Sequence, residues 1–336
     1  MQNHHYQEQP PLNLQNYHYQ DQSPLFGILP GEIRNKIFAY SLVQYEDDSA
    51  AYPEDSYWYR PGFKGPKKAS SSLLETCKLA YAEGQQVFLE ELEWAFWFDR
   101  GPHGRSGYKA CENFFNKLTP SQVRSLEQVR FFTQMYWLED GDALNSIFAN
   151  ANFRPSKLTI TIRYSDWWWW ESDARLTMRQ DWLAKFRGSP GLRELRVEYE
   201  TLSWKQAEMM AIVTRNKDWR LAVTDGGHLS AEDTQLEEWC WTGPSKLGGR
   251  TWNHHGEGDS VEYVVVTDTW KYVEGPIPED VLQKQRAFSR KLSAKEVIWD
   301  VSDSDQGSDE VTEDEGSENE GSEDEGSEDE GSQDQE

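Results

Sequence analysis

Cysteine is scarce in this chain, and the few cysteines lie far apart. The 336 residues include only Cys77, Cys111 and Cys240, too few and too widely spaced for a disulfide framework or a cysteine zinc site. No run of 18 apolar residues occurs, so we expect no membrane-spanning segment. The first 22 residues are polar and lack the apolar core of a signal peptide. These absences predict a protein of the cytosol or the nucleus.

Basic residues are also in short supply. The chain has 34 Lys and Arg against 59 Asp and Glu, a formal net charge of −25. Residues 300–336 hold 18 of the acidic residues and no Lys or Arg, which leaves −7 on residues 1–299. Binding to a phosphate backbone needs clustered Lys and Arg, so we expect no nucleic-acid partner.

Motifs of known catalytic and cofactor sites are missing too. The sequence contains no nucleophile elbow, P-loop, H-E-x-x-H or dinucleotide fingerprint. His254 and His255 are adjacent and would diverge, and no further His or Cys follows at ligand spacing. We therefore expect no enzyme activity, no cofactor and no metal site.

Aromatic residues, in contrast, are abundant: 13% of the chain, with 16 Trp. Large rings bury much apolar area, so a real core is expected although only 37% of the residues are hydrophobic. Residues 1–22 are rich in amides and poor in aliphatic side chains, which predicts disorder. The folded region is expected to begin at Ser23.

The stretch PLFGILPGEIRNKIFAYSL, residues 24–42, predicts a helix from Pro30 to Leu42. Proline suits the first helical position, because its missing N–H is not needed there. Ile33, Ile37 and Tyr40 share one face of such a helix, and Phe38 widens that apolar stripe. The stripe is either an ordinary core-packing face or a docking surface, and both interpretations stay open at this point.

Residues 44–71 contain many prolines and glycines and are predicted to be a loop. Ser72 and Glu75 form a capping-box pattern that predicts a second helix from Ser72. Cys77 would lie in the apolar stripe of this helix as a packing residue. The alternating stretch 93–98 predicts a strand.

The rest of the body predicts an α/β fold. Strands are expected at 126–134, 157–164, 191–199, 218–225 and 260–273, with helices at about 140–150, 173–187, 203–215 and 279–292. Alternating strands and helices favour parallel βαβ units, here in a curved or solenoid-like sheet with irregular spacing. We expect a helical region at 23–98, a Trp-rich body at 99–299, and a disordered acidic tail at 300–336.

Two blocks together resemble the F-box-like domain of a group of filamentous-fungal proteins. The first is LPGEIRNKIF, with the Leu-Pro-x-Glu-Ile-Arg pattern at residues 29–34; the second is LLETCKLAYAEGQQVFLEELEWAFWF, at 73–98. The first block also resembles the start of a true F-box, and this resemblance implies docking to the adaptor of a cullin-RING ubiquitin ligase. The residues that would contact the adaptor are Leu29, Pro30, Ile33, Ile37 and Phe38. The body would then be a substrate receptor; a structural or interaction protein without ligase function is another interpretation.

Two further features suggest partners. Four consecutive tryptophans form a possible aromatic surface: Trp167, Trp168, Trp169 and Trp170. Consecutive side chains diverge in a helix and alternate in a strand, so at most two would face one ligand. The tail repeats E-D-E-G-S, and three of its serines precede an acidic residue at +3, as acidophilic kinases prefer: Ser317, Ser322 and Ser327. The tail is either solubilising or a clasp for basic proteins such as histones or ribosomal proteins, which gives a chaperone-like alternative function.

Overall fold

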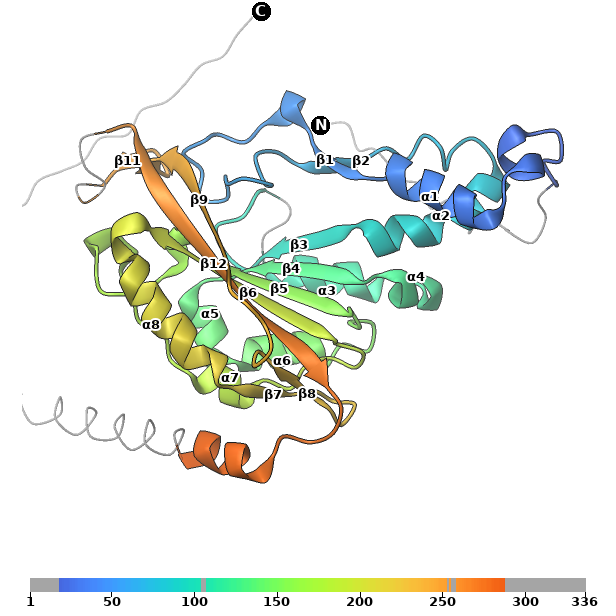
Figure 1. Ribbon diagram of the computed structural model, residues 1–336. Helices are drawn as coiled ribbons and strands as arrows, with labels where there is room; N and C mark the ends of the chain where they lie inside the picture. Colours follow the sequence, from blue (N-terminus) through green and yellow to red (C-terminus); the bar gives the residue numbers. More distant parts are fainter. Residues whose placement is uncertain (1–17, 104–106, 253, 255–257, 288–336) are drawn as a thin grey trace, which may run out of the picture. The chain divides into compact units, whose positions relative to one another are not determined.

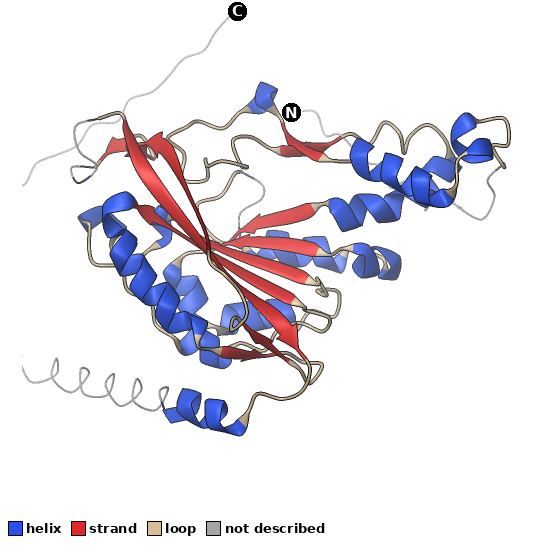
Figure 2. Cartoon of the chain, viewed as in Figure 1, coloured by secondary structure: helices blue, strands red, loops and turns tan. Residues whose placement is uncertain are grey.

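The eight-stranded sheet at the centre of the body is mixed (Figures 1 and 2). It is seen in a computed structural model that describes residues 18–103, 107–252, 254 and 258–287. The strand order is β3-β4-β5-β6-β12-β8-β7, and β9 also pairs with β12. The strands are β3 (Glu93–Trp97), β4 (Gln128–Phe132), β5 (Lys157–Ile162), β6 (Glu194–Leu202), β7 (Arg220–Ala222), β8 (His228–Ser230), β9 (Glu237–Pro244) and β12 (Ser260–Val273).

The first four strands are parallel, as the βαβ pattern predicted. The remaining pairs are antiparallel, because β12 runs back between β6 and β8, and β7 pairs antiparallel with β8. The α/β class is therefore confirmed, the purely parallel expectation for 218–225 is wrong, and the solenoid-like arrangement is not confirmed. The sequence analysis missed β8 and β9.

The helices α3–α8 alternate with the strands, and buried apolar residues of all of these helices except α4 form a single large core with one face of the sheet. They are α3 (Tyr108–Asn116), α4 (Pro120–Ser125), α5 (Met135–Asp140), α6 (Asp142–Phe148), α7 (Asp181–Lys185) and α8 (Gln206–Lys217). In Figure 1, α5, α6, α7 and α8 lie on the same side of the sheet. No helix among the described residues is long and apolar enough to cross a membrane.

The opposite face of the sheet is covered by an arm, residues 44–71, which the sequence predicted only as a loop. The arm starts and ends in a small antiparallel pair, β1 (Gln44–Glu46) and β2 (Lys67–Ala69). Between them, the Phe63 ring lies 4.8 Å from Phe132 and 6.0 Å from Trp97. Arg60 is buried, with its guanidinium 3.5 Å from the carboxylate of Glu198. The arm thus supplies both apolar and ionic contacts to a sheet face that carries charged side chains.

The N-terminal helices are α1 (Gly31–Ser41), after a π-helical turn at Pro24–Ile28, and α2 (Lys78–Glu91). The helix expected from Pro30 is confirmed. The second helix begins later than predicted: Cys77 is its N-cap, with Sγ accepting from the N–H of Ala80 at 3.4 Å. Ser72 does not cap it; instead Ser71 donates to the carboxylate of Glu75 at 2.6 Å in a preceding turn.

Most of the helix predicted at 173–187 is absent; only α7 is helical there. The backbone N–H of Leu176 donates to Glu208 and that of Arg179 donates to Glu139, at 2.8 and 2.6 Å. These side chains belong to neighbouring helices and satisfy backbone donors that a helix would otherwise pair internally. Tertiary contacts therefore hold this segment extended.

Candidate functional site

Helix α1 divides the five predicted contact residues between the core and the surface. Phe38 is fully buried in a small core that α1 shares with α2. Pro30 is exposed and Ile33 is 41% exposed. Leu29 and Ile37 are half-buried. A partner could therefore reach the Pro30 and Ile33 side of the helix but not Phe38.

The rest of the Leu-Pro-x-Glu-Ile-Arg pattern fastens α1 to α2. Arg34 forms a bidentate ion pair with Glu83, at 2.7 and 2.9 Å, and donates to the backbone oxygen of Leu29 at 2.7 Å. The hydrogen bond that Arg34 donates to Glu83 raises the pKa of Arg34. Bidentate guanidinium–carboxylate pairs fix orientation as well as distance. This geometry holds the two helices together and leaves the Ile33 side of α1 toward solvent.

Exposed apolar side chains gather at the N-terminal end of the described chain. Among the described residues ten large apolar side chains are exposed, and six of them lie between residues 19 and 45: Tyr19, Ile28, Ile33, Tyr40, Val43 and Tyr45. Scattered exposed apolar residues are ordinary, but a concentration in one segment is typical of partner surfaces. We call Ile28, Ile33 and Tyr40, on and before α1, the α1 surface.

The four consecutive tryptophans do not form one aromatic surface. Trp167 and Trp170 are buried, and Trp168 is half-buried with its indole N–H donating to Glu139 at 2.9 Å. The Trp167 N–H donates to a backbone oxygen of β6 at 2.8 Å. Only Trp169 is free, with 71% of its side chain exposed. The divergence expected for consecutive side chains explains this split.

Trp169 lies at a pocket of about 180 Å³ beyond the carboxyl ends of the parallel strands. Arg100, Gln134 and Asp166 follow β3, β4 and β5 and line this pocket, together with Tyr136. Crevices outside the carboxyl ends of parallel strands are the usual binding sites of open α/β sheets. We call it the carboxyl-edge pocket.

Strained backbone is concentrated around the carboxyl-edge pocket. The three non-glycine residues with positive φ among the described residues are Arg100 (46°), Trp169 (55°) and Asp173 (52°). Two of them line the pocket and the third follows its last lining residue by two positions. Non-glycine residues in this region carry a free-energy cost of roughly 1–3 kcal/mol and cluster at functional sites. The strain places the exposed Trp169 ring at the pocket mouth.

The polar groups of the carboxyl-edge pocket are mostly held by the protein itself. Arg100 donates to the backbone oxygen of Ser165 at 2.9 Å and to Glu171 at 3.4 Å. Its guanidinium also lies 4.8 Å from the Tyr57 ring and 5.6 Å from that of Trp170. Arg100 therefore shapes the wall and is not free to act as an anion receptor.

Buried charged side chains stabilise the walls of the carboxyl-edge pocket. Asp166 accepts from Arg163 Nε at 2.7 Å and from its backbone N–H at 2.9 Å, and both residues are buried. Burial raises the pKa of Glu139, although the N–H groups of Arg179 and Trp168 act against this rise. These interactions fix the positions of the lining side chains and do not present a nucleophile beside a base.

Some of these residues had a signal in the sequence. Arg100 lies two residues after the predicted strand 93–98, and Gln134 is the last residue of the predicted strand 126–134, so the rule for carboxyl ends of parallel strands would have found them. Tyr136 and Arg60 had no comparable signal, because their place depends on how distant segments meet. The sequence analysis missed all four.

The remaining candidates are scattered. Cys77 caps α2, Cys240 is exposed, and Cys111 is buried, which raises its pKa to about 12. His254 forms a 2.6 Å hydrogen bond with the Tyr164 hydroxyl. Within the described residues no group of three His, Cys, Asp or Glu could hold a metal ion. His255 and the predicted phosphorylation sites Ser317, Ser322 and Ser327 lie outside the described residues.

Comparisons with protein-family models, curated proteins and solved structures gave no match.

Proposed function

We propose that this protein is a non-enzymatic interaction module in which α1 and α2 form an F-box-like region. The α1 surface docks the adaptor of a cullin-RING ubiquitin ligase, and the α/β body receives the substrate. The observation that carries this proposal is the exposed apolar side of α1, where Ile28, Ile33 and Tyr40 remain in solvent while Phe38 fills the core. The resemblance of α1 to the start of a true F-box suggests the kind of partner.

The packing of α1 on α2 supports a docking function for the outer side of α1. The arm separates the two helices in sequence, yet the Arg34–Glu83 pair fixes them as a unit. A rigid helix pair loses little conformational entropy on binding. The free energy gained by burying its exposed apolar side chains is therefore offset less than it would be for a flexible segment.

The carboxyl-edge pocket supports a binding function for the body. Its volume of about 180 Å³ is below the roughly 300–1,000 Å³ of pockets that enclose small-molecule substrates. It is large enough for one side chain of a partner, which the exposed Trp169 and Tyr136 rings would flank. A substrate protein held at one anchor residue fits a receptor better than it fits an enzyme, and a cytosolic or nuclear location fits the same function.

The proposal is tested by mixing the purified full-length protein with the purified adaptor and separating the complexes by size. We expect the wild type to co-elute with the adaptor and the variant Leu29→Ala/Pro30→Ala to elute alone. Circular dichroism checks that the variant keeps its helices. A wild-type protein that does not co-elute with the adaptor would refute the docking function.

A second candidate function is favoured by the charge of the tail. Residues 300–336 hold 18 acidic residues and would bind basic proteins such as histones as a chaperone-like clasp. Deleting 300–336 should abolish histone binding at low salt, and added salt should weaken the binding of the full chain. Histone binding that survives the deletion at low salt would exclude this function.

A further inference from the structure

Strand β3 is an edge of the main sheet with one side open. The N–H of Phe98 donates to Phe132 of β4, so the even-numbered residues of β3 bond to β4 and the odd-numbered ones point outward. Outward, the Glu93 oxygen accepts from the Gln44 side chain at 3.3 Å and the Trp97 oxygen accepts from the N–H of Gly107 at 2.7 Å. The sheet edge is therefore blocked at both ends of β3.

The middle of this edge is not blocked. Between those two bonds lies Ala95, whose backbone N–H and C=O have no partner among the described residues. Strand edges are normally paired, covered or guarded by charge, because unpaired backbone groups invite another strand. The open part of the edge therefore offers one backbone donor and one backbone acceptor, those of Ala95, and suits a short extended segment.

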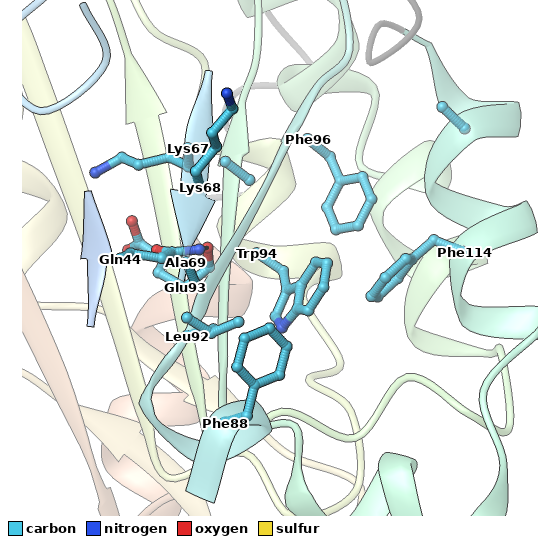
Figure 3. Close-up of a pocket in the computed structure, with 12 residues that line it drawn as sticks. Gln44, Lys67, Lys68, Ala69, Phe88, Leu92, Glu93, Trp94, Phe96 and Phe114 are labelled. Atoms are coloured by element: carbon cyan, nitrogen blue, oxygen red, sulfur yellow. Dashed lines mark hydrogen bonds between the residues drawn. The ribbon is translucent and has the colours of Figure 1, made fainter. Parts of the chain in front are cut away.

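A cavity of about 400 Å³ separates this edge from β2 (Figure 3). Its apolar wall holds Phe88, Leu92, Trp94, Phe96 and Phe114, while Lys67 and Lys68 of β2 form the other side. A second cavity of about 360 Å³ shares three of these rings and extends the apolar wall toward α4. The edge strand thus lies beside a site able to take a large apolar side chain.

Two donors at the cavity have no hydrogen-bond or carboxylate partner among the described residues. The indole N–H of Trp94 is buried and unbonded. Lys67 has no carboxylate partner among the described residues, and its ammonium lies 4.9 Å from the Phe63 ring. Lys68, in contrast, is paired with Asp47. Unpaired donors at a cavity call for a ligand that supplies acceptors.

We propose that this cavity binds an extended peptide of a partner protein. The peptide adds to β3 by pairing its backbone with the N–H and C=O of Ala95. One of its large apolar side chains enters between Phe88, Trp94 and Phe114, and one of its carboxylates meets Lys67. Strand addition takes affinity from backbone bonds and specificity from side-chain pockets, which is the combination present here.

A fatty acid would also match an apolar cavity with a lysine at its rim. It would leave both backbone groups of Ala95 unpaired, whereas a peptide satisfies them, so the peptide is favoured. The site uses no residue of the α1 surface and stands independently of adaptor docking.

The test begins with a phage-displayed library of random dodecapeptides, selected on the full-length protein and counter-selected on the Lys67→Glu variant. Selected peptides are synthesised, and their affinities are measured for the wild type, for Lys67→Glu and for Lys109→Glu. Lys109 is exposed on α3 next to a lining residue, so its variant makes the same charge change outside the cavity. We expect acidic peptides with one aromatic or large aliphatic residue, weakened about tenfold or more by Lys67→Glu and less than about twofold by Lys109→Glu.

N-methylation of each peptide bond in turn then probes strand addition without altering the protein. We expect a single position to lose about tenfold or more in affinity, because it donates to the Ala95 oxygen. Recovery of no peptide that distinguishes Lys67→Glu from wild type would overturn the proposal. A flat N-methylation series would also overturn the proposal. If dodecanoate binds in a way that depends on Lys67 and displaces no peptide, the cavity is a fatty-acid site instead.

Discussion

Phe38 of α1 packs directly against Gly84 of α2. A Cβ atom at Gly84 would lie 2.7 Å from Cδ1 of the Phe38 ring and would also overlap the side chain of Leu74. Glycine is therefore required at this helix position, although it disfavours helix by roughly 1 kcal/mol relative to alanine. The close contact explains how an apolar stripe on α1 is shared between core and surface.

The substitution Gly84→Ala should destabilise the protein by about 1–2 kcal/mol. Overpacking costs about 1–3 kcal/mol, which exceeds the gain in helix propensity. Thermal unfolding of the full chain measures the change. Gly31→Ala is the matched control, because the nearest atom to its added Cβ is the end of the Arg34 side chain at 3.8 Å. A stabilised Gly84→Ala protein would mean that the two helices are not packed as described.

Asp268 in β12 should make stability depend on pH. It is fully buried, its Oδ2 has no hydrogen bond to any of the described residues, and burial raises its pKa to about 6. Because the folded state holds this proton more tightly than the unfolded state, the stability contributed by Asp268 is present below about pH 4 and is lost as pH rises through 6. Between pH 4 and 7 the wild type should lose about 2–3 kcal/mol relative to Asp268→Asn.

Urea unfolding of both proteins at several pH values measures this slope. The slope is independent of any constant offset that the buried Asn amide introduces. The exposed Asp233→Asn substitution is the control and should leave the pH profile of the wild type unchanged. Parallel profiles for wild type and Asp268→Asn would contradict the burial of this carboxyl.

Arg60 should be the most important single residue of the arm. Its buried guanidinium lies 3.5 Å from the carboxylates of Glu198 and Glu200. Burial acts to raise the pKa of Glu198, but the charges of Arg130 and Arg60 outweigh it and lower this pKa below its usual value. Arg60→Met removes one partner of buried charges and should destabilise the protein by about 3–5 kcal/mol.

Lys68→Met is the comparison for Arg60→Met. The Lys68–Asp47 pair lies at the surface, with 54% of the Lys68 side chain exposed, so its loss should destabilise the protein far less than the loss of Arg60. Chemical denaturation of both variants gives the difference. Equal losses would show that the arm does not bury Arg60 against the sheet.

Trp169 should lower the stability of the folded protein, as expected of a residue that has a binding function and no packing function. It is 71% exposed and has a φ of 55°, so Trp169→Gly loses little burial and relieves the backbone. We expect this variant to be more stable by about 1 kcal/mol, whereas Trp170→Ala, at a buried ring, should lose about 3–5 kcal/mol. Thermal melts of the two variants decide. A destabilised Trp169→Gly protein would show that this ring has a packing function.

The sequence predicted individual elements better than their partners. The 14-residue strand β12 and the parallel strands were found because their alternation and apolar runs are local signals. The return of β12 between β6 and β8 was not found, because pairing depends on residues far apart. Arg60 of the arm contacts Glu198 and Glu200 of β6, and Phe63 of the arm packs on Trp97 and Phe132 of the same sheet. Neither Arg60 nor Phe63 could be recognised from the sequence as a residue that covers the sheet, because both lie in a segment rich in Pro and Gly.

The candidate sites show the same limit. Helical spacing indicated that Ile33 and Phe38 belong to one apolar stripe, but only the contact with Gly84 determines that Phe38 is inside and Ile33 outside. The Trp run was recognised, while the place of Trp169 at a sheet edge required the fold.

Calorimetric titration of the purified ligase adaptor into the full-length protein tests the central claim most directly. Ile33→Glu places a charge on the α1 surface, and Asn35→Glu places the same charge on another side of α1, where Asn35 is exposed. If the adaptor docks on the α1 surface, the wild type and Asn35→Glu should bind it with micromolar or tighter affinity, and Ile33→Glu should lose about tenfold or more in affinity. No binding by the wild type, or equal binding by both variants, would contradict adaptor docking at α1.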